Sequence, residues 1–292
     1  MILLHQGQDA PAGAKVVAIG SFDGLHLGHQ SLLSQARAEA NARGLALAVY
    51  TFDPPAQAYF RGESFLASLG EKASDLAEFG VAITVIRAFD QAFAEKDKAW
   101  FLQELAMINP QKIYVGPDFS FGHQRGGTPE DLATLAPTEI VPLFQIGNQP
   151  VKSSVIRRLL NNDEVAEATH FLGRPYTATG VVVPGDRRGA LLGFPTANLE
   201  VPASKLLPRG VYRVNVQHQG QSYRGMANIG VRPTFSGTAI RFEVHIFNFA
   251  GNLYGQVLRV GFLGKIRDEQ KFSGPEELKS QLERDAAAAQ QD

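Results

Sequence analysis

The spacing of apolar residues changes its period about halfway along this 292-residue chain, and the change restricts the folds that the chain can adopt. In the first half, short apolar strands alternate with helical patterns, which is typical of βαβ units. Right-handed crossovers between such units produce a parallel sheet with helices on both faces. The expected strands cover residues 16–19, 46–52, 84–86, 113–115 and 140–143, and the expected helices cover 29–43, 71–79, 97–107 and 129–135.

The second half contains strands with few helices between them. Apolar residues partly alternate with polar ones, and Gly, Pro and Asn separate the runs, which is typical of an antiparallel barrel or sandwich. A helical segment over 153–172 ends at Gly173, and a last helix begins at Pro275. We therefore expect two domains, residues 1–172 and 173–292. The expected strands of the second domain cover 177–183, 210–218, 222–229, 240–249 and 256–264.

Composition excludes several classes of protein. The net charge of −1, with no block of like charges, argues against nucleic acid or an anionic membrane as a partner. Cysteine is absent, which excludes disulfides, thiolate metal sites and cysteine nucleophiles. No signal peptide and no membrane span is expected, so a cytoplasmic location is predicted. The oligomeric state does not follow from the sequence.

Residues 20–29, Gly-Ser-Phe-Asp-Gly-Leu-His-Leu-Gly-His, carry the strongest sign of a nucleotide site. They follow the first expected strand and precede a helical pattern, at the edge of the sheet where such folds bind ligands. A helix N-terminus offers unpaired N–H groups and a partial positive charge, which suits phosphate. Gly28 lets the backbone approach a phosphate closely, and the imidazoles of His26 and His29 can donate hydrogen bonds to its oxygens.

Further segments share a pattern with one known family. In the first half they are Val115-Gly-Pro-Asp-Phe-Ser-Phe-Gly122 and Ser153-Ser-Val-Ile-Arg157. In the second half they are Leu192-Gly-Phe-Pro-Thr-Ala-Asn-Leu199, Ala227–Gly230, Arg232–Thr234, Glu243–His245, Leu253–Gly255 and Lys265–Phe272. With residues 19–29, these segments make the chain resemble the bifunctional bacterial riboflavin kinase/FAD synthetase (FMN adenylyltransferase) family over nearly its whole length. The resemblance implies a Rossmann-like nucleotidyltransferase domain followed by a Greek-key-type barrel with a terminal helix.

The resemblance implies an adenylyl-transfer site in the first half. A phosphate oxygen of FMN would attack the α-phosphorus of ATP, a reaction that needs positioning and charge neutralisation but no general base. His26 and His29 would act as catalytic phosphate donors. Asp23 alternatively forms an Asx turn, and Phe119 alternatively packs in the core. The residues implied to bind nucleotide or flavin are Gly20, Phe22, Asp23, Gly28, Asp118, Phe119, Ser153, Ser154 and Arg157.

The second half would hold the riboflavin kinase site. The ribityl hydroxyl of riboflavin is a neutral nucleophile, so a carboxylate base is useful, and Glu243 matches the family's base. Taken alone, a Glu on a strand is more often a solvated side chain. Thr196 and Asn198 offer a hydroxyl and an amide oxygen as Mg²⁺ ligands. The residues implied to contact ATP or flavin here are Gly185, Arg187, Arg188, Gly193, Thr196, Asn198 and Arg267.

The chain departs from the family pattern at three positions. Lys152 replaces the family's first Ser in its segment, Val155 stands where many members carry Arg, and Ala190 stands where members usually carry Arg. We expect ATP and Mg²⁺ at both sites, riboflavin and FMN as substrates, and FAD as product. The alternatives are a descendant with one competent site, a flavin-binding regulator without catalysis, and a tRNA-directed adenylating enzyme.

Overall fold

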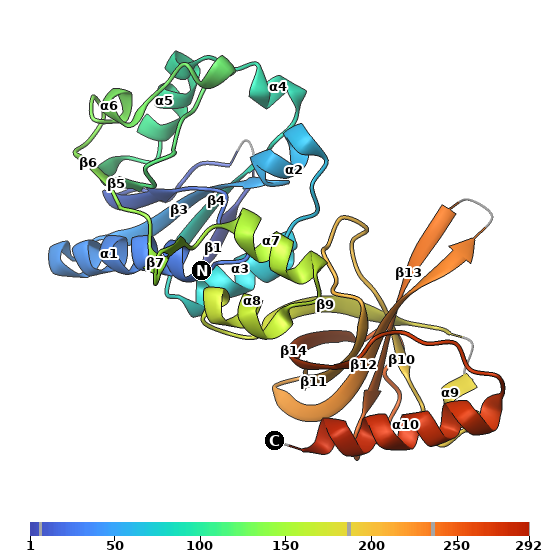
Figure 1. Cartoon of the computed structure of the whole chain (residues 1–292). Helices are drawn as coiled ribbons and strands as arrows, with labels where there is room; N and C mark the ends of the chain where they lie inside the picture. The colour runs from blue at the N-terminus through green and yellow to red at the C-terminus, as the bar shows by residue number, and fades with distance from the viewer. Residues whose placement is uncertain (6–7, 186–187, 235–236, 292) are drawn as a thin grey trace. The chain divides into compact units, whose positions relative to one another are not determined.

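Two units make up the fold, residues 1–153 and residues 154–292. The computed structural model describes residues 1–5, 8–185, 188–234 and 237–291. For residues 188, 231–234 and 237–239 it describes the backbone alone. The first unit contains a parallel sheet and the second a closed barrel (Figure 1).

The sheet of the first unit has six strands, all parallel, in the order β1-β4-β3-β2-β5-β6. The strands are β1 (Ile2–Leu4), β2 (Lys15–Ile19), β3 (Ala46–Asp53), β4 (Ile83–Ala88), β5 (Pro110–Val115) and β6 (Thr138–Ile140). The strand order reverses between β2 and β5, and ligands of such sheets bind beyond the strand ends at this switch point. Residues 20–29, the histidine motif, follow β2 directly, so the fold positions this motif at the switch point.

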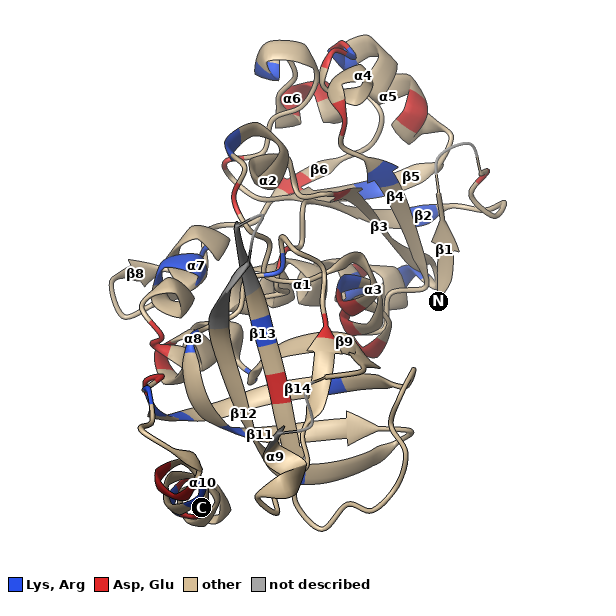
Figure 2. Cartoon of the chain, turned by 90° about the vertical axis from the view of Figure 1, so that its right-hand side faces the viewer, with Lys and Arg blue, Asp and Glu red and all other residues tan. Residues whose placement is uncertain are grey.

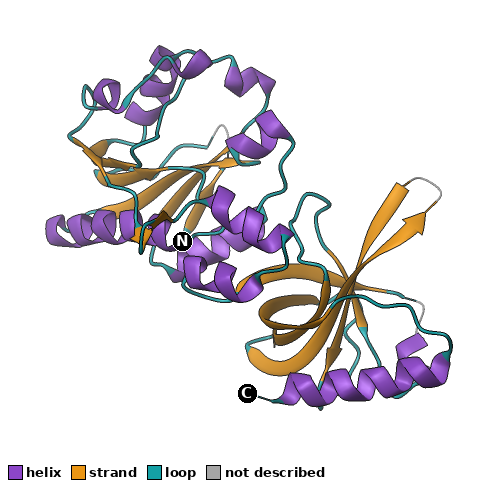
Figure 3. Ribbon diagram, viewed as in Figure 1, coloured by secondary structure: helices purple, strands orange, loops and turns teal. Residues whose placement is uncertain are grey.

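Helices cover both faces of this sheet, because alternate strand residues point to opposite sides (Figure 3). Val16 and Ala18 pack with α1 (Leu27–Arg43) and α3 (Leu69–Glu78) in one core cluster. Val17 and Ile19 pack in another cluster with α5 (Lys98–Ala106). The shorter elements of this unit are α2 (Ala56–Arg61), α4 (Gln91–Ala94), α6 (Pro129–Leu132), a 3₁₀ turn (His123–Arg125), β7 (Gln145–Ile146) and β8 (Gln149–Pro150).

The predicted α/β architecture is confirmed, with differences at short elements. The last strand was expected at 140–143 and lies at Thr138–Ile140, beside β5. The edge strand β1, which pairs with β4, was not expected. It has only three residues, of which two are exposed, so it lacks the apolar run that marks a buried strand.

The second unit is a closed antiparallel barrel in the order β10-β13-β12-β11-β14-β9. This order resolves the choice between barrel and sandwich. The hairpin-connected strands β11, β12 and β13 are followed by β14, which returns to pair with β11 as in a Greek key. The strands are β9 (Tyr176–Val183), β10 (Ala197–Glu200), β11 (Gly210–His218), β12 (Gln221–Thr234), β13 (Gly237–Ile246) and β14 (Val257–Arg267).

Among its described residues, the second unit has three longer helices and one short one beside the barrel strands. The terminal helix α10 (Pro275–Gln290) was predicted, and α9 (Arg188–Leu191) is a single turn. The helical segment expected over 153–172 is two helices, α7 (Ser153–Asn161) and α8 (Val165–Leu172), and α8 ends at Gly173. The chain turns between them at Asp163, whose carboxylate accepts hydrogen bonds from the backbone N–H of Arg209 (2.7 Å) and from Nζ of Lys265 (3.0 Å). These bonds attach the helix pair to the barrel.

Charged residues of both signs are distributed over the elements of each unit (Figure 2). In the part of the chain that the structure describes, no helix combines the length and apolar character needed to cross a membrane.

Candidate active sites

The turn after β2 is held by a buried carboxylate. Phe22, Gly24 and Leu25 have positive φ angles of 45°, 80° and 42°, so the backbone turns sharply between strand and helix. Asp23 is buried, and its Oδ1 accepts hydrogen bonds from the backbone N–H groups of Leu66 (2.8 Å) and Ala67 (3.0 Å). The side chain of Asp23 therefore anchors the turn to the segment before α3, a longer-range role than the Asx turn.

The two histidines of the motif stack at the N-terminus of α1. His26 is the N-cap, and its Nδ1 accepts a hydrogen bond of 3.2 Å from the backbone N–H of His29. The imidazole rings lie 3.6 Å apart between centroids, inclined by 14°. The buried ring of Phe22 packs edge-on against His29 at 5.2 Å. Phe22 thus supports the histidine from the core.

The environment of His29 favours its neutral form. Burial of the ring lowers the pKa of His29 well below its ordinary value, and the charges of His26 and Lys72 lower it further. Lys72, on α3, is buried and donates a hydrogen bond of 2.7 Å from Nζ to the carbonyl of Phe52. Nδ1 of His29 is buried without a hydrogen-bond partner among the described residues.

The segment before α7 lies against the same turn. Ser153 donates a hydrogen bond of 3.0 Å from Oγ to the carbonyl of Asp23. A Cβ at Gly28 would lie 3.1 Å from the carbonyl oxygen of Val151 and 3.2 Å from the ring of His26, so a side chain there would press on the motif. Lys152 forms an ion pair of 2.7 Å with Asp118, which follows β5. This ion pair links the segment before α7 to the loop after β5.

Ser154 and Arg157 belong to the second unit, where Ser154 is exposed and Arg157 is buried. Their role in the phosphate site stays a prediction.

Gly20 and Asp118 border a cavity of about 720 Å³ in the first unit. Its walls are rich in aromatic side chains, which are Phe52, Tyr59, Phe60, Phe89, Phe93, Phe101, Phe119 and Phe121. Phe119 stacks on Phe121 at 5.9 Å, so it lines the cavity and packs on a neighbour at once.

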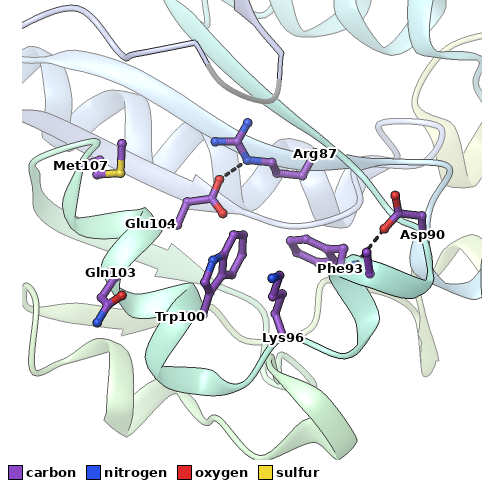
Figure 4. A pocket seen from close by; sticks show the side chains of 9 residues that line it. Arg87, Asp90, Phe93, Lys96, Trp100, Gln103, Glu104 and Met107 are labelled. Carbon is purple, nitrogen blue, oxygen red and sulfur yellow. Dashed lines mark hydrogen bonds and ion pairs between the residues drawn. The ribbon is translucent and has the colours of Figure 1, made fainter.

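A second cavity of the first unit, about 330 Å³, lies between β4, α4 and α5 (Figure 4). The buried side chains of Arg87 and Glu104 form an ion pair on its wall, and Trp100 and Phe93 contact each other edge to face beside it. Burial and then the charge of Glu104 raise the pKa of the neighbouring Tyr50. No sequence pattern had indicated this buried pair.

The barrel has a cavity of about 240 Å³ that Glu243 lines. Glu243, on β13, pairs in register with Asn198 of β10 and Asn228 of β12. Thr196 and Asn228 border the same cavity. The side chain of Arg241 forms an ion pair of 2.9 Å with Glu243. Arg241 was not predicted, although period-2 alternation places it on the same face of the strand as Glu243.

Arg267 is held by a buried partner. Nε and Nη2 of its guanidinium donate three hydrogen bonds of 2.7 to 3.0 Å to the carboxylate of Asp285 on α10. The ring of Phe272 lies 5.7 Å from the guanidinium carbon. All three side chains border the cavity, so Arg267 contributes to its wall while it ties β14 to α10. Nothing in the sequence had indicated Asp285 as the partner of Arg267.

The residues near position 187 that were expected to contact ATP are described in part. Arg187 lies outside the described residues, and only the backbone of Arg188 is described. A Cβ at Gly185 would lie 2.1 Å from the side-chain amide of Asn198, so only glycine fits there. Gly193 has a positive φ of 87° and ends the turn that contains α9.

Comparison with known proteins matches both units. The FAD synthetase family model covers residues 8–155, and the riboflavin kinase family model covers residues 172–292. The bifunctional riboflavin kinase/FMN adenylyltransferase of Listeria monocytogenes is 37% identical, over 93% of this chain and 90% of its own. The enzyme of the same name from Escherichia coli K12 is 35% identical, over 99% of this chain and 96% of its own.

A solved structure described as a macrolide-efflux protein from Streptococcus pneumoniae has the same fold. It is 32% identical, its TM-score is 0.86, and the match covers 98% of this chain and 97% of that one. The sheet with its histidine turn and the barrel with its carboxylate-lined cavity define a transferase with a nucleotidyltransferase part and a kinase part. The chain belongs to the bifunctional riboflavin kinase/FMN adenylyltransferase family and is an enzyme with both domains.

Proposed function

We propose that this chain phosphorylates riboflavin to FMN with ATP in one domain, residues 173–292, and adenylylates FMN to FAD in the other, residues 1–172. One observation carries this assignment. The histidine motif, residues 20–29, and the cavity that Glu243 lines belong to separate units of the chain. Each site has the chemistry that its own step requires.

Adenylyl transfer needs donors for phosphate and no base. A phosphate oxygen of FMN attacks the α-phosphorus of ATP, the bond to the β-phosphate breaks, and pyrophosphate leaves. A neutral imidazole still donates one N–H, so the lowered pKa of His29 is compatible with a role as hydrogen-bond donor to phosphate. His26 caps the helix that carries His29, and Asp23 fixes the turn before it. The aromatic cavity beside Gly20 suits the flat ring of a flavin.

Riboflavin phosphorylation needs a proton acceptor. The 5′-hydroxyl oxygen of riboflavin attacks the γ-phosphorus of ATP, its proton passes to the Glu243 carboxylate, and ADP leaves with the electrons of the broken P–O bond. The cavity that Glu243 lines would take the ribityl chain. In this proposal Gly185, Arg187, Arg188 and Gly193 would contact the bound ATP.

Magnesium fits the donor set of the barrel. Mg²⁺ prefers oxygen ligands, takes few from the protein and keeps water and substrate phosphates. The Thr196 hydroxyl and the Asn198 amide oxygen would hold it, and Gly185 leaves room beside the Asn198 amide. The ion would neutralise phosphate charge.

The remaining expectations concern partners and location. We infer that the partners are the small molecules ATP, riboflavin and FMN, without nucleic acid, because the net charge is near zero. A cytoplasmic location remains a prediction from the sequence.

Incubation of the purified chain with ATP and Mg²⁺ tests the proposal, with riboflavin in one reaction and FMN in another. Chromatography should show FMN and then FAD from riboflavin, and FAD and pyrophosphate from FMN. Formation of FMN alone, or conversion of FMN alone, would indicate one competent site. Flavin binding without any product would indicate a regulator and contradict the proposal.

A further inference from the structure

Arg241 faces the kinase cavity beside the proposed base. Nη2 of Arg241 lies 2.9 Å from Oε1 of Glu243, and both side chains line the same cavity. Residues two apart on a strand share a face, so β13 presents a guanidinium and a carboxylate side by side. The exposed fractions of the two side chains are 32% and 17%, so the pair is in reach of a bound substrate.

The residues in register with the pair on the neighbouring strands carry no charge. Glu243 lies in register with Asn198 and Asn228, which are uncharged, and Arg241 places a cation beside its carboxylate. Arg241 lies opposite Gly230, where a Cβ would sit 1.9 Å from the carboxylate of Glu269. The missing side chain therefore lets a second carboxylate approach the strand next to Arg241. Arg267 is the other arginine among the described residues of the wall. Its Nε and Nη2 donate hydrogen bonds to the carboxylate of Asp285.

The reaction places a developing charge next to this guanidinium. The hydroxyl that gives its proton to Glu243 is the one that bonds to the γ-phosphorus, so the transferring group must lie within a few ångströms of the carboxylate. A guanidinium that holds the carboxylate can also donate to the oxygens of that group. Phosphoryl transfer depends mainly on positioning and on neutralising this charge.

We propose that Arg241 is a catalytic residue of riboflavin phosphorylation, which orients Glu243 and neutralises charge on the phosphoryl group as it moves from ATP to the 5′-oxygen. The proposal rests on Glu243 being the base. The bond from the β–γ bridging oxygen to phosphorus breaks as the new O–P bond forms, the proton goes to Glu243, and Arg241 keeps its own protons.

The test compares R241M, R241K and a control, R224M, in the full chain. Arg224 lies on the neighbouring strand β12, is exposed and donates to the carbonyl of Gln290. We expect R241M to lower kcat for FMN formation by about 10²- to 10³-fold, as for loss of a transition-state donor. Its KM for riboflavin should change less than about threefold, because the interaction strengthens in the transition state. R241K, which keeps a point charge without the fork, should lose roughly tenfold.

Several results would overturn the proposal. They are a kcat of R241M within about threefold of the wild type, a higher KM with unchanged kcat, or an equal loss in R224M. If R241M does not fold by circular dichroism, R241K decides, and a wild-type kcat in R241K contradicts the proposal. The variant E243Q tests the role of Glu243 as the base separately from the role of Arg241. Full kinase activity of E243Q refutes Glu243 as base, whereas an inactive E243Q with an active R241M refutes Arg241 alone.

Discussion

Replacing Glu104 by Gln should destabilise the first unit by about 3–5 kcal/mol, because it removes one partner of a buried ion pair. Glu104 on α5 pairs with Arg87 at the end of β4, and their side chains are 8% and 11% exposed (Figure 4). After the substitution the guanidinium of Arg87 keeps its charge, although its side chain is only 11% exposed. The loss is therefore mainly the cost of an uncompensated buried charge.

The size of the effect follows from what surrounds the pair. Nη1 of Arg87 is buried and has no hydrogen-bond partner among the described residues, so no second carboxylate replaces Glu104. The double variant R87M/E104M removes both charges and should be far less destabilised than E104Q, since apolar replacement of a buried pair is often neutral. The exposed pair of Lys112 and Glu139 provides the control, and E139Q should cost less than about 1 kcal/mol.

Trp100 makes the measurement specific to this unit. It is the only tryptophan of the chain and lines the same cavity as Glu104. Urea unfolding followed by its fluorescence should show a lower midpoint for E104Q with an unchanged slope. The melting temperature should fall by roughly 6–20 °C for a unit of this size. A loss below about 1 kcal/mol, or a double variant as unstable as E104Q, would refute the reasoning.

Three further predictions concern the two sites. Gly28→Val should lower FAD formation from FMN by about 10²-fold and leave FMN formation unchanged. The reason is that the new side chain would lie too close to Val151 and His26. Separate assays of the two steps measure this. Because the pKa of His29 lies below its ordinary 6.5 in the folded chain, the unfolded chain binds more protons, and stability should fall as pH drops through 6.5. Urea unfolding of H29Q should show a weaker pH dependence than the wild type, and an equal dependence would contradict the shift. Asp285→Asn should destabilise the barrel by about 1.5–3 kcal/mol through its bonds to Arg267, and thermal unfolding by circular dichroism would detect it.

The sequence predicted the long elements well, for a physical reason. Strands β2 and β3 are buried on both faces, so they read as continuous apolar runs that no helix pattern resembles. The barrel strand β10 was not expected, because it has four residues with one buried and follows an extended Pro-Thr segment. The break between α7 and α8 was also missed, since both helices bury an apolar face and Asp163 looks like an ordinary helical residue.

Local chemistry of the candidate sites was predictable, and long-range partners were not. The N-terminal position of His26 and His29 on a helix followed from the strand and glycine that precede them. The bonds from Asp23 to residues 66 and 67 could not be predicted, because nothing in either segment indicates the other. The same holds for Arg267 and Asp285, which lie on different elements. Arg241 could have been found from its spacing to Glu243.

The central claim is that two independent sites in one chain carry successive steps. The most direct test is chromatography of the flavins formed by H29A and by E243A, each supplied with riboflavin and, separately, with FMN. H29A should make FMN and no FAD, whereas E243A should make FAD from FMN and no FMN from riboflavin. Loss of both activities in either single variant, with the chain still folded, would contradict the account.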